Sequence, residues 1–269
     1  MSRENKEPIP LFAVLLLYFF SGALALVYQV VWSRMMMHVF GSTAVALGTV
    51  LAAFMAGLAI GSWLIGKSAD KSTNCLRLYA YLEIGLALTA LVSHILLSHI
   101  GPVHLMLHDL FGFSDATFAL IRFLLAFVLV MAPTILMGAT LPVLTRFLVR
   151  RQTLVGVDLS TLYATNTFGA VAGVLITGFF LIGTYGIHIP VYIAVAGNLV
   201  IGCIAWLVSL RVADASQSSP PIASEPDEGQ ASKFGSVDQL TFRIILIGLG
   251  ISGFTSFAYE IYWTRSLVF

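Results

Sequence analysis

The chain has 269 residues, of which 58% are hydrophobic and 10% are charged, and its formal net charge is +1. Soluble domains carry roughly 25% charged residues, so this composition excludes a water-soluble globule and predicts a protein with the lipid bilayer as its main solvent. Lys and Arg are spread over short segments rather than gathered in one patch, which excludes nucleic acid as a partner.

Long apolar runs dominate the sequence. A run of about 20 such residues crosses a bilayer as an α-helix. We therefore predict an all-α, polytopic membrane protein with seven transmembrane helices. The predicted spans are residues 10–32, 44–66, 78–98, 119–148, 162–183, 187–209 and 240–263. Pro133 and Pro142 in the fourth span predict a kinked or extended helix inside the bundle, because neighbouring helices have to satisfy the backbone groups that prolines free.

The basic residues are distributed unequally between the two ends of these spans. Only Arg34, Arg122 and Arg265 fall at one end, whereas the other eleven Lys and Arg residues lie at the end shared by the N-terminus and the even-to-odd connections. Cytoplasmic connections of membrane proteins carry an excess of Lys and Arg. We therefore expect the N-terminus and the even-to-odd connections to lie in the cytoplasm.

The seventh span repeats the first at a constant offset. The matching pairs are Ser21 and Ser252, Gly22 and Gly253, Tyr28 and Tyr259, Gln29 and Glu260, Trp32 and Trp263, Ser33 and Thr264, and Arg34 and Arg265. A repeat across five intervening spans predicts a six-helix half at 1–211 and the first helix of a second half at 240–269. The Pro- and Ser-rich, acidic stretch 212–239 is predicted to be a flexible cytoplasmic linker.

Polar residues within apolar spans mark candidate binding sites. Glu83 in the third span, Glu260 in the seventh, Gln29 in the first and Asn166 in the fifth are the candidate substrate contacts. If the carboxylates line a cavity, they attract a cation or relay a proton. Structural explanations remain open, because Glu83 is close enough to the cytoplasmic surface to extend towards it and Glu260 is close to Arg265. Asn198 in the sixth span is a further intramembrane amide.

Two other patterns have a structural and a functional explanation. Tyr28, Trp32 and Arg34, like their repeats, are typical of an aromatic belt at the membrane interface. Glycines recur at small-xxx-small spacing in the second and fifth spans, which favours close helix packing and leaves a sliding surface as the alternative. These glycines are Gly57, Gly61, Gly66, Gly169, Gly173 and Gly178.

The sequence provides no pattern for catalysis, a cofactor or a metal. It has no nucleophile–base pair and no phosphate-binding loop, so no catalytic residue is predicted. Cys75 and Cys203 are far apart and predict neither a disulfide nor a metal site. Four histidines share a loose helical spacing without thiols or carboxylates, so a wet interfacial face is favoured over a metal site. They are His94, His99, His104 and His108.

Gly66, Asp70 and Lys71 close the second span, and this segment resembles the loop between helices two and three of the major facilitator superfamily. In that family an Asp there stabilises one alternating-access state, so the resemblance implies a conformational switch. Thr73 and Asn74 stand where the family usually has Gly and a basic residue. An ordinary positively charged cytoplasmic turn is the alternative.

Three stretches resemble bacterial membrane proteins described as fused major-facilitator-like and spermidine synthase proteins. The stretches are Ser21-Gly22 with Tyr28 to Arg34, Pro133 to Pro142, and Leu162 to Ala170. The resemblance spans essentially the whole chain and implies a multi-pass protein of the bacterial inner membrane with a link to polyamines. Relatives carry a spermidine synthase domain, which this sequence lacks, so no catalytic residue is carried over and enzymatic activity stays open.

Together these patterns predict a major-facilitator-like transporter module for a small solute, with a spermidine- or putrescine-like polyamine as the candidate. The alternative is the membrane anchor of a C-terminal spermidine synthase domain. The two differ in their partners: the transporter requires a second half and a solute, whereas the anchor requires only its synthase domain.

Overall fold

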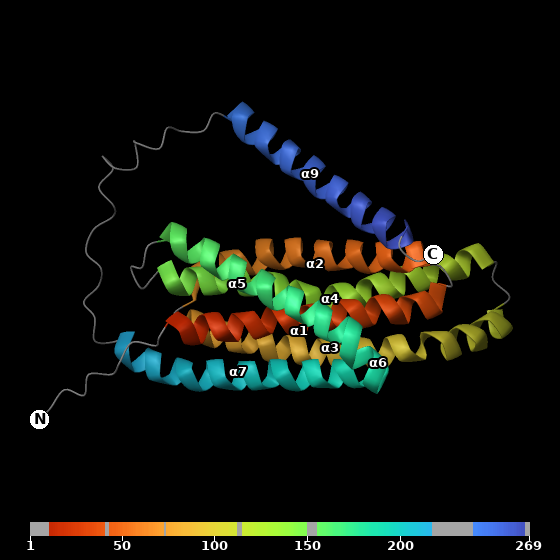
Figure 1. Cartoon of the computed structure of the whole chain (residues 1–269), viewed down its shortest axis with the longest axis horizontal. Helices are drawn as coiled ribbons and strands as arrows, with labels where there is room; N and C mark the ends of the chain where they lie inside the picture. The colour runs from red at the N-terminus through yellow and green to blue at the C-terminus, as the bar shows by residue number, and fades with distance from the viewer. Residues whose placement is uncertain are drawn as a thin grey trace, which may run out of the picture. The chain divides into compact units, whose positions relative to one another are not determined.

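The computed structural model describes residues 11–40, 43–72, 74–111, 115–149, 155–216 and 239–266. These residues form helices and short turns, and no strand occurs among them. The helices in chain order are α1 (Leu11–Phe40), α2 (Thr43–Lys71), α3 (Cys75–Phe111), α4 (Asp115–Val149), α5 (Val155–Ile176), the π-helical segment η1 (Thr177–Leu181), α6 (Ile182–Tyr185), α7 (Ile189–Ser216) and α9 (Gln239–Ser266) (Figure 1).

Within the described ranges, seven helical segments are long and apolar enough to cross a membrane. α5, η1 and α6 run on from one another and together form one of these segments, Leu159–Tyr185. The predicted all-α fold class with seven transmembrane helices is therefore confirmed, and the chain is a multi-pass membrane protein.

Several helices extend beyond their predicted spans. α3 starts at Cys75 and continues to Phe111, and α4 is a single helix across both prolines. α7 continues to Ser216, into the predicted 212–239 linker, while residues 217–238 of that linker lie outside the described residues. The predicted boundaries were too short because polar and charged residues at the helix ends interrupt the apolar run that marks a span.

The chain divides into two compact units, Met1–Ala213 and Asp214–Phe269. In the first unit α1 lies at the centre and contacts α2, α3, α4 and α5 (Figure 1). The ribbon shows α2 and α4 on one side of α1 and α3 and α7 on the other. α9, the repeat of α1, belongs to the second unit and is described as a single helix.

Glycines bring α2 and α4 into direct backbone contact. A side chain at Gly57 would collide with Thr134, and one at Gly61 would collide with the backbone of Ile135. Gly138 of α4 lies in the same way against Leu58 of α2. Lipid offers no hydrophobic force between helices, so this close packing supplies the attraction that holds the pair.

Glycines also bring α5 into direct backbone contact with α1. Gly169 and Gly173 lie against the backbone of Phe19 and Ala23, respectively, with no room for a larger residue. Gly66 and Gly178 have no such contact: the nearest atom to a Cβ at Gly66 is 3.8 Å away, and nothing lies within 4 Å at Gly178. The predicted packing role is therefore confirmed for two glycines in each span and wrong for Gly66 and Gly178.

The interior position that the prolines predict for α4 is confirmed at Pro133. Proline has no N–H, so the carbonyl of Leu129, one turn earlier, has no partner within the helix. The Ser93 hydroxyl of α3 donates a hydrogen bond to this carbonyl at 2.7 Å. Next to the proline, Thr134 donates to the backbone of its own helix and lies 3.4 Å from the Ala53 carbonyl of α2. α4 is thus inside the bundle, as its prolines predict.

We expect Gly61→Ala to destabilise the protein by about 1–3 kcal/mol, because the new methyl group overlaps the Ile135 backbone and forces α2 and α4 apart. SDS-induced unfolding in mixed micelles measures the change. Gly178→Ala is the matched control, since a methyl group there meets open space. Equal stability of the two variants would contradict the close packing of α2 and α4.

A second prediction concerns Ser93 and Pro133. Ser93→Ala leaves the buried Leu129 carbonyl unpaired and should cost about 1–3 kcal/mol. In a Pro133→Ala background the backbone N–H of residue 133 satisfies that carbonyl, so the same substitution should cost much less. A double-mutant cycle of unfolding free energies measures this coupling. Additive effects would show that Ser93 does not compensate for the proline.

Candidate functional site

Glu83 of α3 is completely buried in the first unit. The Ser21 hydroxyl of α1 donates to its Oε1 at 2.6 Å, and the Asn198 amide of α7 donates to its Oε2 at 2.6 Å. One carboxyl group on α3 therefore joins three helices. The alternative in which Glu83 extends towards the membrane surface is wrong, because both of its oxygens are held inside the bundle.

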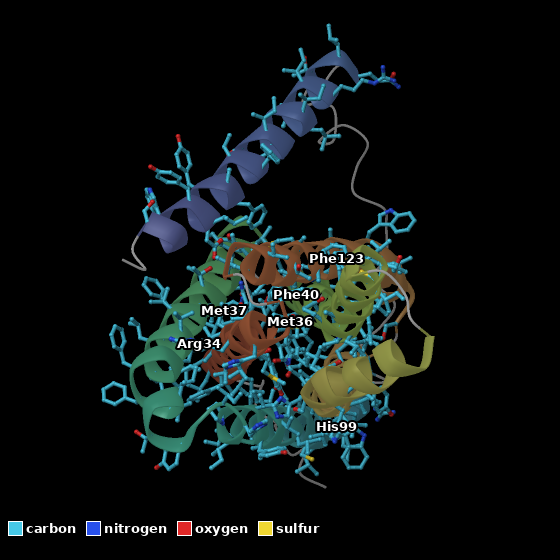
Figure 2. All side chains as sticks on the ribbon, turned by 90° about the vertical axis from the view of Figure 1, so that its right-hand side faces the viewer. Arg34, Met36, Met37, Phe40, His99 and Phe123 are labelled. Atoms are coloured by element: carbon cyan, nitrogen blue, oxygen red, sulfur yellow. The ribbon has the colours of Figure 1, made fainter. Side chains whose placement is uncertain are left out.

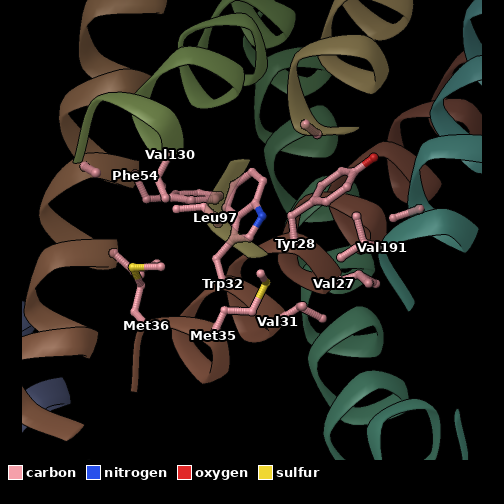
Figure 3. Close-up of a cluster of buried hydrophobic side chains, with 14 of the residues drawn as sticks. Val27, Tyr28, Val31, Trp32, Met35, Met36, Phe54, Leu97, Val130 and Val191 are labelled. Carbon is pink, nitrogen blue, oxygen red and sulfur yellow. The ribbon is translucent and has the colours of Figure 1, made fainter. Parts of the chain in front are cut away.

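Tyr28 extends this network along α1. Its hydroxyl donates to Asn198 Oδ1 at 2.9 Å, so Asn198 both accepts from α1 and donates to α3. The Tyr28 ring stacks on Trp32, with ring centroids 5.4 Å apart and planes 20° apart (Figure 3). Both aromatic side chains are fully buried among apolar residues of α2, α3, α4 and α7. Their predicted place in an interfacial aromatic belt is therefore wrong.

Sequence spacing and small residues explain how the network forms. Ser21 and Tyr28 are seven residues apart, so they share one face of α1 over two helical turns. On α7, Gly202 lies against Ala80 and Ile84 of α3, and a Cβ there would be 3.1 Å from the Ala80 carbonyl oxygen. The missing side chain allows α7 to approach α3 closely enough for Asn198 to reach Glu83.

The surroundings of Glu83 are polar but uncharged. Its hydrogen-bond donors are a hydroxyl and an amide, and no described Lys or Arg forms an ion pair with it. The Tyr79 hydroxyl, one turn earlier on α3, is also buried and makes no hydrogen bond to any described residue. An ionised carboxylate without a cationic partner is costly away from water. The site is therefore suited to taking up a positive charge, either a proton or a cationic group.

The other predicted contacts do not join Glu83. Gln29 is half-buried, and its backbone carbonyl accepts from Ser33, without a hydrogen bond to the network. Asn166 of α5 packs against Gly22, beside Ser21 in the chain, and likewise does not bond to Glu83. Glu260 lies on α9 in the second unit. Its predicted pairing with Arg265 falls outside the side chains that the structure describes.

The predicted switch residues are not in a turn. Gly66, Asp70 and Lys71 lie in the last turns of α2, and the connection to α3 follows at residues 72–74. The side chains of Asp70 and Lys71 are outside the described residues. Asn74 joins α3 to α7 at this end of the unit. Its Oδ1 accepts the Arg77 N–H and caps α3. Its side-chain amide donates to the Ser209 carbonyl of α7 at 3.2 Å.

The sequence pattern singles out Glu83 but not two other members of its network, Ser21 and Tyr28, as site residues. It places Ser21 only in the repeat, and Tyr28 in the repeat and the interfacial aromatic belt. One rule could have found them: a buried carboxyl needs donors on neighbouring helices, and these are among the few polar residues in the middle of the first span. The repeat retains the aromatic pair, since the Tyr259 and Trp263 rings of α9 are 6.1 Å apart.

No protein-family model, curated protein or solved structure matches this chain. The described residues contain no group of three or more His, Cys, Asp or Glu side chains that could hold a metal ion. The functional argument therefore depends on the Glu83 network itself.

Glu83→Gln should leave the unfolding free energy within about 1 kcal/mol of wild type, because Gln can accept from Asn198 and donate to the Ser21 oxygen. Glu83→Leu should cost about 1–3 kcal/mol for each donor left unsatisfied. SDS-induced unfolding of both variants measures the difference. If the Leu variant were as stable as the Gln variant, the hydrogen bonds of Glu83 would not hold the helices together.

Proposed function

We propose that this chain is the membrane module of a transporter that moves a small cationic solute. The observation that carries the proposal is the fully buried Glu83 carboxyl, held by neutral donors from α1 and α7 and without a described cationic partner. Ionisable groups inside a membrane are costly and typically mark solute or proton pathways. A solute ammonium group, or a proton that exchanges with it, supplies the positive charge.

The resemblance to fused major-facilitator-like and spermidine synthase proteins supports a polyamine as the solute, since putrescine and spermidine are small polycations. The distribution of Lys and Arg supports a cytoplasmic N-terminus, and the same resemblance supports the bacterial inner membrane. In this proposal α9 is the first helix of a second half. Alternating access then exposes the Glu83 region to each side in turn, and Gly66, Asp70 and Lys71 contribute to the switch.

A second candidate is a membrane anchor for a spermidine synthase domain. It is favoured by the completeness of the network, because Glu83, Ser21 and Asn198 all find hydrogen-bond partners within the bundle. A network whose only role is to lock three helices together has this property. The two functions differ in what they require of Glu83: a transporter requires its charge, whereas an anchor requires only its hydrogen bonds.

Glu83→Gln separates these two roles. The transporter proposal predicts that polyamine flux in proteoliposomes falls below about a tenth of the wild-type rate, since losing one partner of a buried charge pair costs roughly 2 kcal/mol or more. The measurement is uptake of labelled putrescine and spermidine by the natural full-length protein, with neutral and anionic solutes of similar size for comparison.

Ser93→Ala is the matched control, because it removes another buried hydrogen bond from α3 without touching Glu83. It should lose stability but retain flux. Wild-type flux in Glu83→Gln would remove Glu83 from the transport pathway. Absence of flux for every solute with the wild-type protein would favour the anchor.

A further inference from the structure

A pair of histidines joins α3 to the turn between α6 and α7. His188 Nδ1 lies 3.1 Å from His94 Nε2, and the two rings meet edge to face with centroids 5.1 Å apart. His94 is buried, with 1% of its surface exposed, whereas His188 is exposed. The prediction of a wet histidine face is therefore wrong for His94, although His99 is exposed as expected. His104 and His108 are outside the described side chains.

His188 also organises the start of α7. Its backbone carbonyl accepts the N–H groups of Val191 and Tyr192, at 3.1 and 3.4 Å. Two residues earlier, Gly186 has a φ of +74°, a conformation that favours glycine. The Tyr192 ring packs edge-on against His94, with centroids 5.7 Å apart. His188 thus links the connection between α6 and α7 to the first turn of α7 and to α3.

The protonation of the neutral pair follows from its partners. His94 Nδ1 is buried and has no hydrogen-bond partner. If Nδ1 carried the proton, a buried N–H would remain without an acceptor, which is more costly than an unpaired lone pair. We therefore assign the His94 proton to Nε2, where it is donated to His188 Nδ1. The proton of His188 is then on its exposed ring, at Nε2.

This pair responds to the number of protons that it binds. One additional proton can keep the hydrogen bond, because one ring still offers a lone pair to the other; the unpaired N–H that this leaves at His94 Nδ1 weakens the latch without opening it. A second proton makes both facing nitrogens donors and places two positive rings in contact, so the bond is lost and the rings repel each other. Tyr192 of α7 is the other titratable side chain against His94, and no described carboxylate bonds to either ring.

Apolar residues lie between the histidine pair and Glu83. His94 and Glu83 are eleven residues apart on α3, or about 16 Å along the helix. The buried side chains between them in this core are Leu86, Ala87 and Ala90 from α3, with Val191 and Ala194 from α7 in the same cluster. Movement of the first turn of α7 away from α3 would expose this region to water.

We propose that His94 and His188 form a proton-operated latch, closed while they bind at most one extra proton and opened by the second. Opening releases the start of α7 from α3 and admits water towards the centre of the bundle. The latch concerns this end of the bundle, which lies towards the viewer in Figure 2, and does not require Glu83 to bind a solute. Its test therefore stands apart from the flux experiment.

The experiment measures exposure of Val191, which is fully buried when the latch is closed. Val191→Cys, in a chain with Cys203→Ser, is labelled with a thiol reagent in nanodiscs, where both faces are accessible. The second proton has to enter a buried ring that already faces a charged one, so labelling is compared between about pH 7.5 and about pH 3.5. A thiol reacts more slowly as the pH is lowered. The labelling rate at each pH is therefore divided by the rate of the same cysteine in a His188→Gln variant.

The glutamine side-chain oxygen of that variant accepts from His94 Nε2 and gains no charge, so its latch should stay closed. We expect the normalised labelling rate of the His188 protein to rise about tenfold or more at the low pH. A ratio that stays constant with pH would overturn the proposal. Near-ultraviolet circular dichroism identifies general unfolding, and a rise accompanied by loss of that signal would overturn it as well.

Discussion

Inside a bilayer there is no water to bond a polar group, so a buried donor or acceptor without a partner in the protein is costly. The first unit follows this constraint at several levels. The carbonyl freed by Pro133 receives the Ser93 hydroxyl, and the Glu83 carboxyl receives donors from α1 and α7. Glycine contacts bring the helices close enough for these bonds to form. Hydrogen bonding of the buried polar groups and close packing of the helices therefore depend on each other in this bundle.

The number and type of the helices could be predicted from the sequence, because run length alone distinguishes a span from a buried soluble helix. Pro133 predicted the interior position of α4, because the carbonyl that a proline leaves unpaired needs a donor from a neighbouring helix in any membrane protein. Glycine spacing likewise predicted contacts at Gly57, Gly61, Gly169 and Gly173. These predictions succeeded because each depends on one residue type and a local rule.

The rotation of each helix about its axis could not be predicted. α1 is apolar all round, so its sequence does not say which face meets lipid and which meets protein. For that reason Tyr28 and Trp32 were assigned to the membrane interface although they are buried, and His94 was assigned to a wet face although it is enclosed. The partners of Glu83 lie 62 and 115 residues away in the chain, beyond the reach of any local pattern.

The site combines two properties that have different consequences. Its hydrogen bonds hold α1, α3 and α7 together, which any membrane module needs for stability. An ionisable carboxyl without a described cationic partner is the property that a purely structural contact does not need, and it is the basis of the transport proposal. The histidine pair joins α3 to the turn that precedes α7, so both ionisable sites lie along the contact of α3 with α7 and its preceding turn.

The central claim is that one carboxyl group on α3 bonds to α1 and α7 together. Two double-mutant cycles test it directly, one between Glu83→Leu and Ser21→Ala and one between Glu83→Leu and Asn198→Leu. Each cycle should give a coupling free energy of about 1 kcal/mol or more, because either partner loses its bond once Glu83 is absent. Additivity in both cycles would contradict the account, since Glu83 would then not be the residue that joins these three helices.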